Sequence, residues 1–367
     1  MCEHPTDTFS FGQGAPAPSS PYTLADDVTD GQRWQIAKAE ASAVASAFQR
    51  DLSSEIQRKA ARMATCGQRL IYAYDPLTDG RYRRTLAEAR LCRVRTCPIC
   101  AWRRAERLAA EVGRVIHRLC GPGGLVPLML TLTVRNVDVS SLHDELGKML
   151  HGWSKLRKRQ YFVRLVTHWT RSIEITRGRG HICGDSHPHI HCILMAKPEE
   201  AGWLLGVNWA KEWAEVMSLD YVPQCHIMVL NGTISEALKY TVKPHDLTRH
   251  AISGWLARVE EALSGVRVFA ASNKLRLKDI AVDDAAETER TTHNEVDELP
   301  NGIPVGRKNI PITVCYNWTG RVYIRGAVII GQGAADIRAQ QIALARAVKA
   351  RAAPPRGRPT GSASRFF

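Results

Sequence analysis

The sequence lacks the features of several broad protein classes. No apolar run reaches the roughly 18 residues of a membrane-spanning helix, and the first 14 residues carry neither the basic nor the apolar region of a signal peptide. We therefore expect a cytoplasmic protein that neither spans a membrane nor follows the classical secretory route. The sequence also lacks internal repeats and the HExxH signature of zinc peptidases.

Acidic residues are in deficit. Lys and Arg total 50 against 36 Asp and Glu, which gives a formal net charge of +14. Such a charge attracts polyanions, so we expect a phosphate-rich partner. Hydrophobic residues make up 44% of the chain, which excludes wholesale disorder. The ten cysteines, without an export signal, indicate a reducing compartment in which clustered thiols hold metal more often than they form disulfides.

Composition divides the chain into five segments. Residues 1–31 are rich in Pro, Gly, Ser and Thr and are expected to form a disordered tail, and residues 351–367 form a second, basic tail. Between the tails we expect three ordered parts. Residues 32–122 are a helical, cysteine-rich segment that we expect to bind zinc and DNA. Residues 123–270 are a central catalytic domain, and residues 271–350 are an extension with an acidic linker, strands and a helix.

Hydrophobic periodicity predicts a mixture of strands and helices. Strand-like runs lie at 125–134, 172–176, 189–195, 224–230 and 314–330. Helical patterns lie at 32–63, 140–164, 199–217, 251–270 and 334–352, with a shorter helix near 234–243. The sequence therefore predicts an α+β fold, with a central antiparallel sheet of about five strands and flanking helices.

The most informative motif is HPHIHCIL at 187–194. In a strand, His189 and His191 point to the same side and lie about 7 Å apart along the backbone. Two imidazoles so placed can chelate one divalent cation. The alternative is a pair of solvent-facing histidines on a half-buried strand. His187 precedes a proline at the strand entry, and we expect it to support the site rather than to bind the cation.

Glu174 lies in the preceding strand-like run, between Ile173 and Ile175. A carboxylate in an apolar run is costly unless it faces water, a cation or a metal. If the two strands pair, Glu174 completes a site with two histidines and one carboxylate, which suits Mg²⁺ or Mn²⁺ acting on phosphate. The alternative is an exposed glutamate on the polar side of the strand.

The run EALKYTVK at 236–243 carries a third group of candidates. On a helix, Glu236, Tyr240 and Lys243 form one row. Together they offer a base, a nucleophile and a cation for a phosphate. The alternative is an ordinary helix surface with an ion pair and a half-buried tyrosine.

Four cysteines have the spacing of a metal site. Cys66, Cys92, Cys97 and Cys100 follow the pattern C-x25-C-x4-C-x2-C, in which the CPIC pair can hold one tetrahedral ion and two distant thiolates complete it. We expect structural Zn²⁺ here, and the alternative is a set of scattered reduced thiols.

Basic residues cluster in the cysteine-rich segment and in the segment after the LTLT run, where Trp102, Trp153 and Tyr161 are interleaved with them. Cations with aromatic rings suit a single nucleic-acid strand, whereas the alternative is a solvated charged surface. The residues assigned to holding the DNA backbone are Arg93, Arg95, Arg103, Arg104, Lys155, Arg157, Lys158 and Arg159.

The order of the motifs resembles a known superfamily. A strand ending LTLT (130–133), then HPHIHCIL, then EALKYTVK, is similar to the three motifs of the HUH endonucleases, and in particular to the single-tyrosine initiators of rolling-circle plasmid replication. The resemblance covers roughly residues 66–246. It implies a ferredoxin-like fold with the histidines on a central strand.

The resemblance also implies roles for individual residues. His189 and His191 are metal ligands with Glu174 as a third, Tyr240 is the nucleophile that cuts one DNA strand, and Lys243 assists at the phosphate. Attack leaves a 5′-phosphotyrosine and a free 3′-hydroxyl that primes a polymerase. A lone tyrosine makes one such link, so termination by strand transfer needs water or a second subunit, and Glu236 occupies the place of the residue that activates water.

The implied partners are plasmid origin DNA, single-stranded or cruciform, a host helicase and DNA polymerase, and a second copy of the chain; no membrane is involved. Related alternatives are an HUH transposase or relaxase of a mobile element. From other classes, a non-catalytic zinc-dependent DNA-binding regulator leaves the histidines unexplained, and a small-substrate metallohydrolase leaves the +14 charge unexplained.

Overall fold

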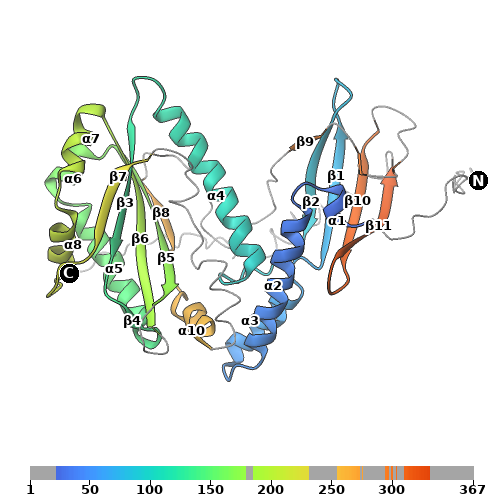
Figure 1. Ribbon diagram of the computed structural model, residues 1–367, viewed down its shortest axis with the longest axis horizontal. Coiled ribbons are helices and arrows are strands. Elements are labelled where there is room, and N and C mark those ends of the chain that lie inside the picture. Colours follow the sequence, from blue (N-terminus) through green and yellow to red (C-terminus); the bar gives the residue numbers. More distant parts are fainter. Residues whose placement is uncertain are drawn as a thin grey trace, which may run out of the picture.

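Two antiparallel sheets lie on either side of the long helix α4 (Pro98–Leu119), as Figure 1 shows. The computed structural model describes residues 22–178, 185–230, 254–272, 275, 294–296, 299–300, 303 and 310–330. No helix within these ranges is long and apolar enough to cross a membrane. The expected α+β class, with antiparallel sheets and flanking helices, is confirmed.

The first sheet is built on a β-α-β-β-α-β unit with strand order β7-β3-β6-β5, which is the ferredoxin-like arrangement. Its neighbouring strands are all antiparallel. β8 extends the sheet beside β5, and β4 pairs briefly with β6. The strands are β3 (Val126–Thr133), β4 (Val137–Asp138), β5 (His168–Arg177), β6 (Asp185–Ala196), β7 (Cys225–Val229) and β8 (Phe269–Ala271).

Alternation along β3 separates the two faces of this sheet. Leu128, Leu130 and Leu132 are fully buried, whereas Thr131 and Thr133 between them are half-buried. The leucine face, which we call the apolar face, packs in a core with several helices. On the left of Figure 1 these are α5 (Leu142–Leu156), which follows the short 3₁₀ turn η1 (Val139–Ser141), then α6 (Gln160–Leu165), α7 (Pro198–Leu205) and α8 (Trp209–Met217). Helix α10 (Trp255–Ala262) lies near the lower end of the sheet.

The single helix expected over 199–217 is divided into α7 and α8. The side chain of Asn208 accepts a hydrogen bond from the backbone N–H of Lys211 (3.1 Å) and so starts a new helix. The helix expected over 251–270 is also shorter, because Phe269–Ala271 leaves α10 behind and pairs with β5. In both places a local cap or a long-range pairing overrides the helical periodicity.

The second sheet joins segments from both ends of the chain. Its order is β11-β10-β1-β2-β9, so two strands from the cysteine-rich segment pair with strands from the C-terminal extension. The sequence indicated the paired strands in 314–330 but not the two N-terminal ones. The strands are β1 (Arg69–Pro76), β2 (Tyr82–Ala89), β9 (Asn294–Val296), β10 (Ile312–Trp318) and β11 (Tyr323–Ile330).

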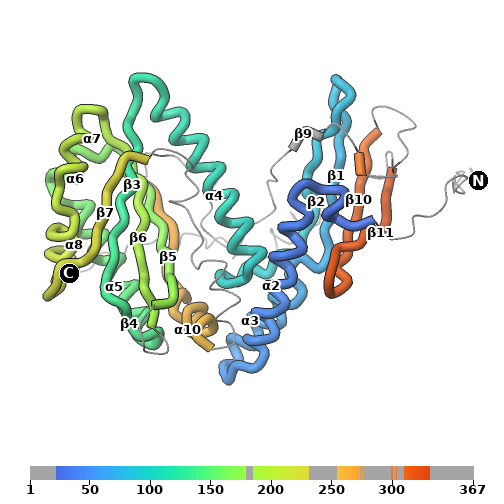
Figure 2. Tube along the Cα trace, in the orientation of Figure 1, coloured from blue at the N-terminus to red at the C-terminus, as the bar shows by residue number. Residues whose placement is uncertain are grey.

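Residues 22–31 belong to the folded part of the chain, which differs from the expected tail over 1–31. In α1 (Leu24–Asp27), Leu24 is fully buried, and Thr23 forms a β-bridge with Ile324 of β11. Figure 2 shows the blue N-terminal helices beside the red C-terminal strands. The expected helices in 32–63 are confirmed as α2 (Gly31–Gln49) and α3 (Ser54–Ala64).

Helix α4 packs against both parts of the molecule. Near its start, the Trp102 ring meets the Trp34 ring of α2 edge to face, with centroids 5.1 Å apart. Near its end, Val112 and Ile116 share a small core with Ile193 and other residues of the first sheet. This contact lies on the face opposite the leucines. We call it the polar face because the part of β6 that precedes Ile193 presents its histidines there.

A buried ion pair fixes α1 to the second sheet. Asp27 accepts hydrogen bonds from Arg325 (2.9 and 2.7 Å) and from the Tyr316 hydroxyl (2.8 Å), and its side chain is fully buried. Replacing Asp27 with Ala leaves a buried cation without its carboxylate, so we expect the free energy of unfolding to fall by about 3–5 kcal/mol in denaturant titrations. The exposed pair of Asp79 and Arg81 supplies the control, and Asp79→Ala should unfold at nearly the wild-type denaturant concentration.

Candidate functional site

The register of the first sheet brings the predicted histidines and glutamate to one face. In antiparallel pairing, Glu174 of β5 lies opposite His189 of β6, and His191 lies opposite Thr131 of β3. Directly opposed residues point to the same side of a sheet. Hence these side chains, together with His187, form a strip on the polar face. Glu174 is 5% exposed, so it lies inside the protein rather than on an exposed polar surface.

His191 is held from two sides. Its Nε2 lies 2.7 Å from Oε2 of Glu174, and its Nδ1 lies 3.2 Å from the hydroxyl of Thr131. A neutral ring with hydrogen on Nε2 donates to the carboxylate and accepts from the threonine. Thr131 belongs to the LTLT run that leads the three motifs, which gives that run a physical role in orienting the imidazole.

The three histidines of β6 form a stack. The rings of His187 and His189 are nearly parallel (8°), with centroids 4.2 Å apart, and the rings of His189 and His191 are 5.9 Å apart at 15°. Burial lowers the pKa of His187, which favours its neutral form. His187 therefore lies within β6 against His189, where it supports the neighbouring ring as expected.

The donor set suits a divalent cation chemically, since it offers neutral imidazole nitrogens and a carboxylate. In the geometry seen here, however, Glu174 and His191 bond directly to each other. Among the described residues, the four cysteines form the group in which three or more ligand atoms all lie within 4.8 Å of one another. A cation on the histidine strip would thus take the place of the contact between carboxylate and imidazole.

The predicted nucleophile and its neighbours, Tyr240, Glu236 and Lys243, lie outside the described residues. The elements on either side of them are described, and both contact the first sheet. β7 pairs with β3, and α10 is joined to β6 because the indole N–H of Trp255 donates to the hydroxyl of Ser186 (3.0 Å). Ser186 is the residue before His187, so α10 begins at the end of β6 that carries the histidines.

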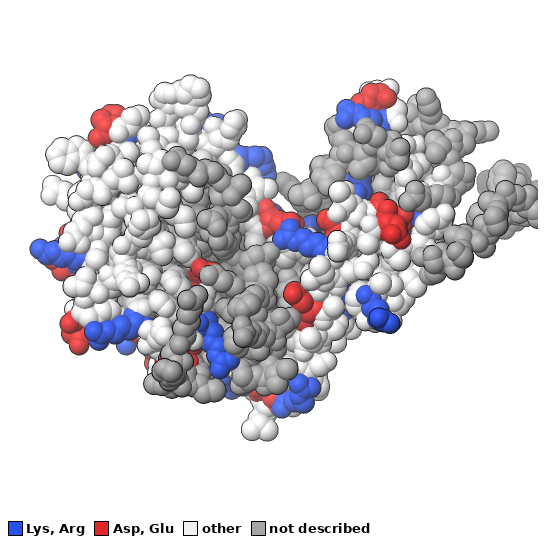
Figure 3. All heavy atoms as spheres, in the orientation of Figure 1, with Lys and Arg blue, Asp and Glu red and all other residues white. Residues whose placement is uncertain are grey.

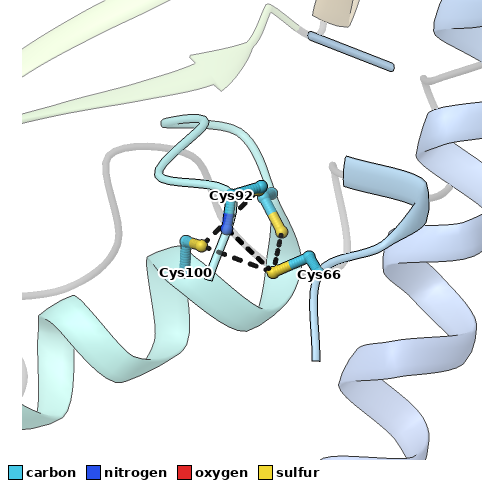
Figure 4. A group of neighbouring side chains, drawn as sticks. Cys66, Cys92 and Cys100 are labelled. Carbon is cyan, nitrogen blue, oxygen red and sulfur yellow. Dashed lines mark hydrogen bonds between the residues drawn. The ribbon is translucent and has the colours of Figure 1, made fainter. Parts of the chain in front are cut away.

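The predicted zinc ligands are brought together and buried, as Figure 4 shows for three of them. The sulfur of Cys66 lies 3.6 Å from that of Cys100 and 3.7 Å from that of Cys97, and the sulfurs of Cys92 and Cys100 are 3.6 Å apart. Tetrahedral ligands at a Zn–S distance of about 2.3 Å lie about 3.8 Å from one another, so these positions fit one ion. The cluster could therefore hold a metal.

The backbone around these sulfurs is shaped for the cluster. The N–H of Cys92 donates to the sulfur of Cys66 (3.4 Å), and the N–H of Arg93 donates to that of Cys100 (3.3 Å). Arg93 has a positive φ of 62°, which turns its N–H toward the sulfur. Gly67 has φ 61°, and a Cβ there would lie 2.9 Å from Ile99, so glycine is needed beside Cys66.

Two buried charged residues lie near the cysteines, and no pattern in the sequence indicates that they are important. Lys38 of α2 is 1% exposed and donates to the carbonyl of Ala64 (2.8 Å). Burial lowers the pKa of Lys38, while the nearby cysteines act in the opposite direction. A tetrathiolate site with a divalent ion has a net charge of −2, so a buried cation nearby offsets part of that charge.

Glu260 of α10 is the second such residue. One of its oxygens accepts hydrogen bonds from both the N–H and the hydroxyl of Thr96 (2.9 Å each), and the other lies 3.2 Å from Lys59 of α3. Thr96 is adjacent to Cys97. Since Trp255 at the other end of α10 bonds to Ser186, this helix connects the cysteine cluster with the histidine strand.

The predicted DNA-binding cations fall on two sides of the first sheet. Arg103 and Arg104 lie on α4, which packs on the polar face, whereas Lys155 and Lys158 lie at the end of α5 on the apolar face. Lys155 and Lys158 are exposed. The loop residues Arg93 and Arg95 precede α4 and are half-buried beside the cysteines.

Several of these cations and aromatics have intramolecular roles. Arg103 lies over the Trp34 ring at 5.5 Å, and Arg159 pairs with Glu215 at 3.0 Å. Trp102 and Trp153 are each 3% exposed, so the interleaved tryptophans are core residues rather than open stacking surfaces. On the face seen in Figure 3, basic and acidic residues of the described part are interspersed and form no single basic patch.

Comparisons with known proteins agree with these observations. Three relatives named "Protein rep" are 33% identical over 179 residues (Bacillus amyloliquefaciens), 31% over 177 residues (a Bacillus species) and 29% over 227 residues (Lentilactobacillus hilgardii). These alignments cover 48%, 48% and 57% of this chain, and 51%, 56% and 69% of the relatives. The chain thus spans about half the length of the first two curated relatives it matches. No solved structure matches the chain.

A family described as "Replication protein" matches residues 83–324, which is more than half of the chain. The match includes three of the four clustered cysteines, the histidine strand and the EALKYTVK run, and it confirms the resemblance that these motifs carry. The chain belongs to the family of replication proteins that comprises rolling-circle plasmid replication initiators of the HUH type.

Proposed function

We propose that the protein starts rolling-circle plasmid replication by nicking one strand of origin DNA, with Tyr240 as the nucleophile. The observation that carries this proposal is the buried contact between Glu174 and His191, beside His189, in a chain of the replication protein family. A buried carboxylate that shares one face of the sheet with two imidazoles offers the ligand types of a divalent-cation site, and a cation held there could act on a phosphodiester.

In this proposal His189, His191 and Glu174 hold Mg²⁺ or Mn²⁺. The bound cation would act as a Lewis acid on the scissile phosphate. Thr131 would orient the ring of His191 through Nδ1. A ring that bound the cation through Nε2 would carry its hydrogen on Nδ1 and donate it to the Thr131 hydroxyl. His187 stacks on His189 and limits the rotation of that ring.

Tyr240 attacks the phosphorus, so that a bond between the phenolic oxygen and phosphorus forms and the bond from phosphorus to the 3′-oxygen breaks. The phenolic proton is lost, the 3′-oxygen leaves as a hydroxyl, and the 5′ side stays on the protein as a phosphotyrosine. A tyrosine hydroxyl has a pKa near 10, so this attack needs a nearby cation, and Lys243 contributes positive charge at the phosphate. Glu236 activates water for the terminating cleavage.

The partners follow from this chemistry. The origin must present a single strand, either melted or extruded as a cruciform, and the free 3′-hydroxyl serves a host polymerase behind a host helicase. Arg103 and Arg104 belong to α4, whose C-terminal half packs on the same side of the sheet as the histidines, and would hold the strand that is cut. A second copy of the chain could supply a second tyrosine for strand transfer.

For the cysteine cluster we propose structural Zn²⁺. The thiolate set and the two N–H···S bonds are typical of zinc knuckles. The ion would fix the loop that carries Thr96, and through Glu260 it would fix the start of α10 against the histidine strand.

The nucleophile is tested with Tyr240→Phe. Wild-type protein, incubated with labelled single-stranded DNA from the parent replicon, should give a covalent product on a denaturing gel, and peptide mapping should place the label on residue 240. The variant should give none, because it lacks the attacking oxygen, yet should still bind the DNA. Tyr161→Phe, on the far side of the sheet, is the matched control and should keep the product. An undiminished covalent product from Tyr240→Phe would refute the assignment.

The cation site is tested with Glu174→Gln, which keeps the shape and removes the charge. We expect the dissociation constant for Mn²⁺, measured by titration calorimetry, to rise about 10–100-fold. Glu111→Gln, which alters a carboxylate on the surface of α4, should bind Mn²⁺ as the wild type does. Chelation should stop nicking, and Mg²⁺ or Mn²⁺ should restore it. Equal Mn²⁺ affinity in both variants would remove Glu174 from the site.

The zinc proposal is tested by metal analysis of the purified protein. We expect one zinc per chain, and Cys100→Ser should lose it and unfold at lower temperature, because three thiolates hold the ion less well. Cys120→Ser changes a half-buried cysteine outside the cluster and should keep both the zinc and the unfolding temperature. Full zinc content in Cys100→Ser would exclude the four-cysteine site.

A further inference from the structure

Three arginines approach one another on the side of β5 that faces away from the histidine strip. Arg171 alternates with Ser172 along β5 and points to the apolar face, away from Glu174. Arg157 follows the last turn of α5, and Arg267 lies in the turn between α10 and β8. Arg171 donates to the carbonyl of Val268, the residue after Arg267, and Arg157 lies over the ring of Trp169 on β5, so the three arginines gather near the start of β5.

Arg171 is buried without a counter-ion. It is 4% exposed, one of its terminal nitrogens donates to the carbonyl of Val268 (3.1 Å), and its Nε is buried with no hydrogen-bond partner. The residue opposite it on β6 is Cys192, and burial raises the pKa of that thiol well above its usual range, so it stays neutral. Burial, with the two neighbouring cations, lowers the pKa of Arg171 to about 10, which still leaves it charged at neutral pH.

Arg157 has the same deficit. Its guanidinium lies over the ring of Trp169 at 4.9 Å, and its Nε is also buried without a partner. Trp169 is two residues before Arg171 on the same face of β5 and is half-buried. Arg267 is exposed and marks the open side of the cluster. Within the described part of the chain, no carboxylate forms an ion pair or hydrogen bond with any of the three arginines.

Other arginines of this protein are paired where they are buried. Arg325 meets Asp27 at 2.7 Å, and Arg84, at 5% side-chain exposure, lies near Asp30. Arg159, only two residues after Arg157, pairs with Glu215. A buried charge without a partner is strongly unfavourable, and three close cations add mutual repulsion. The cluster therefore requires a negatively charged group, and the described residues do not supply one.

We propose that Arg157, Arg171 and Arg267 form a second phosphate site, which takes a backbone phosphodiester of a single DNA strand away from the nick. Guanidinium groups offer paired N–H donors that match phosphate oxygens. Lys155 of α5 and Lys158 just after this helix are exposed and close to Arg157 in the sequence. The inference that the site binds phosphate depends only on the positions of the arginines. The inference that this phosphate belongs to DNA rests on the proposed function.

The site is first tested with inorganic phosphate, without DNA and without divalent cations. At constant ionic strength, replacing chloride with phosphate should raise the unfolding temperature of the wild type by about 2–4 °C, because the anion binds the folded state only. Arg171→Met keeps the length of the side chain and should lose this rise. Arg114→Gln, at an exposed arginine of α4, should keep it. A wild type that is indifferent to phosphate, or a full rise in Arg171→Met, would overturn the proposal.

Because a buried substitution can disturb folding, Arg267→Gln provides a second variant at an exposed position. It should fold as the wild type does and show a smaller rise in phosphate, whereas an unchanged rise would exclude Arg267 from the site. The temperature readout does not involve Tyr240 or the cation on the histidine strip, so a failure of the nicking proposal leaves it unaffected.

The source of the phosphate is tested by DNA affinity at several salt concentrations. Each phosphate that the protein neutralises makes the slope of log affinity against log salt more negative by about 0.7 for a single strand, so loss of one contact makes the slope shallower by about 0.7. Arg171→Met should show this shallower slope with an oligonucleotide that extends beyond the nick, and the wild-type slope with one that ends at the nick. Loss of the phosphate effect with an unchanged slope would assign the site to free phosphate and overturn the assignment to DNA.

Discussion

The pairing of β5 with β6 is the constraint on which the candidate site depends. The register sets Glu174 opposite His189, so a carboxylate and the imidazoles share one face and Glu174 reaches His191. A slip of one residue would move Glu174 into the apolar face. Ile173 and Ile190, also opposite each other and almost fully buried, oppose such a slip, because it would expose them. The hydrophobic core on one side of the sheet thus fixes the chemistry on the other.

The same logic explains why the cysteine cluster lies where it does. α4 begins at the cysteines and ends on the polar face of the first sheet, and α10 bonds to the cysteine loop at Glu260 and to the histidine strand at Trp255. Both helices also bury apolar side chains, α10 in the large core and α4 in a small core with the first sheet. The hydrogen bonds of Glu260 and Trp255 add directional contacts to this packing. Order in the loop beside Cys97 therefore constrains the helix that follows the proposed nucleophile.

Local patterns in the sequence were sufficient for part of this arrangement. Period-two alternation placed His189 and His191 on one face, and short cysteine spacings indicated a metal cluster, because each depends on residues close in the chain. Pairing of β1 with β10 joins residues about 240 positions apart, and no local period reports it. Lys38, Glu260 and Arg171 were missed for the same reason, since each looks like an ordinary surface charge until the fold buries it.

The net charge of +14 is therefore a poor guide to where DNA binds. Many individual cations have intramolecular partners: Arg159 is paired with acids and Arg103 lies over tryptophan rings, and exposed charges of both signs are interspersed on the surface in Figure 3. The informative cations are those that folding buries and leaves without a carboxylate, as with Arg171. Because Arg171 and Glu174 point to opposite faces of β5, a strand that reaches both must pass around the β8 edge of the sheet. The affinity for DNA and the cleavage of DNA would then depend on opposite faces of β5, so that one could change without the other.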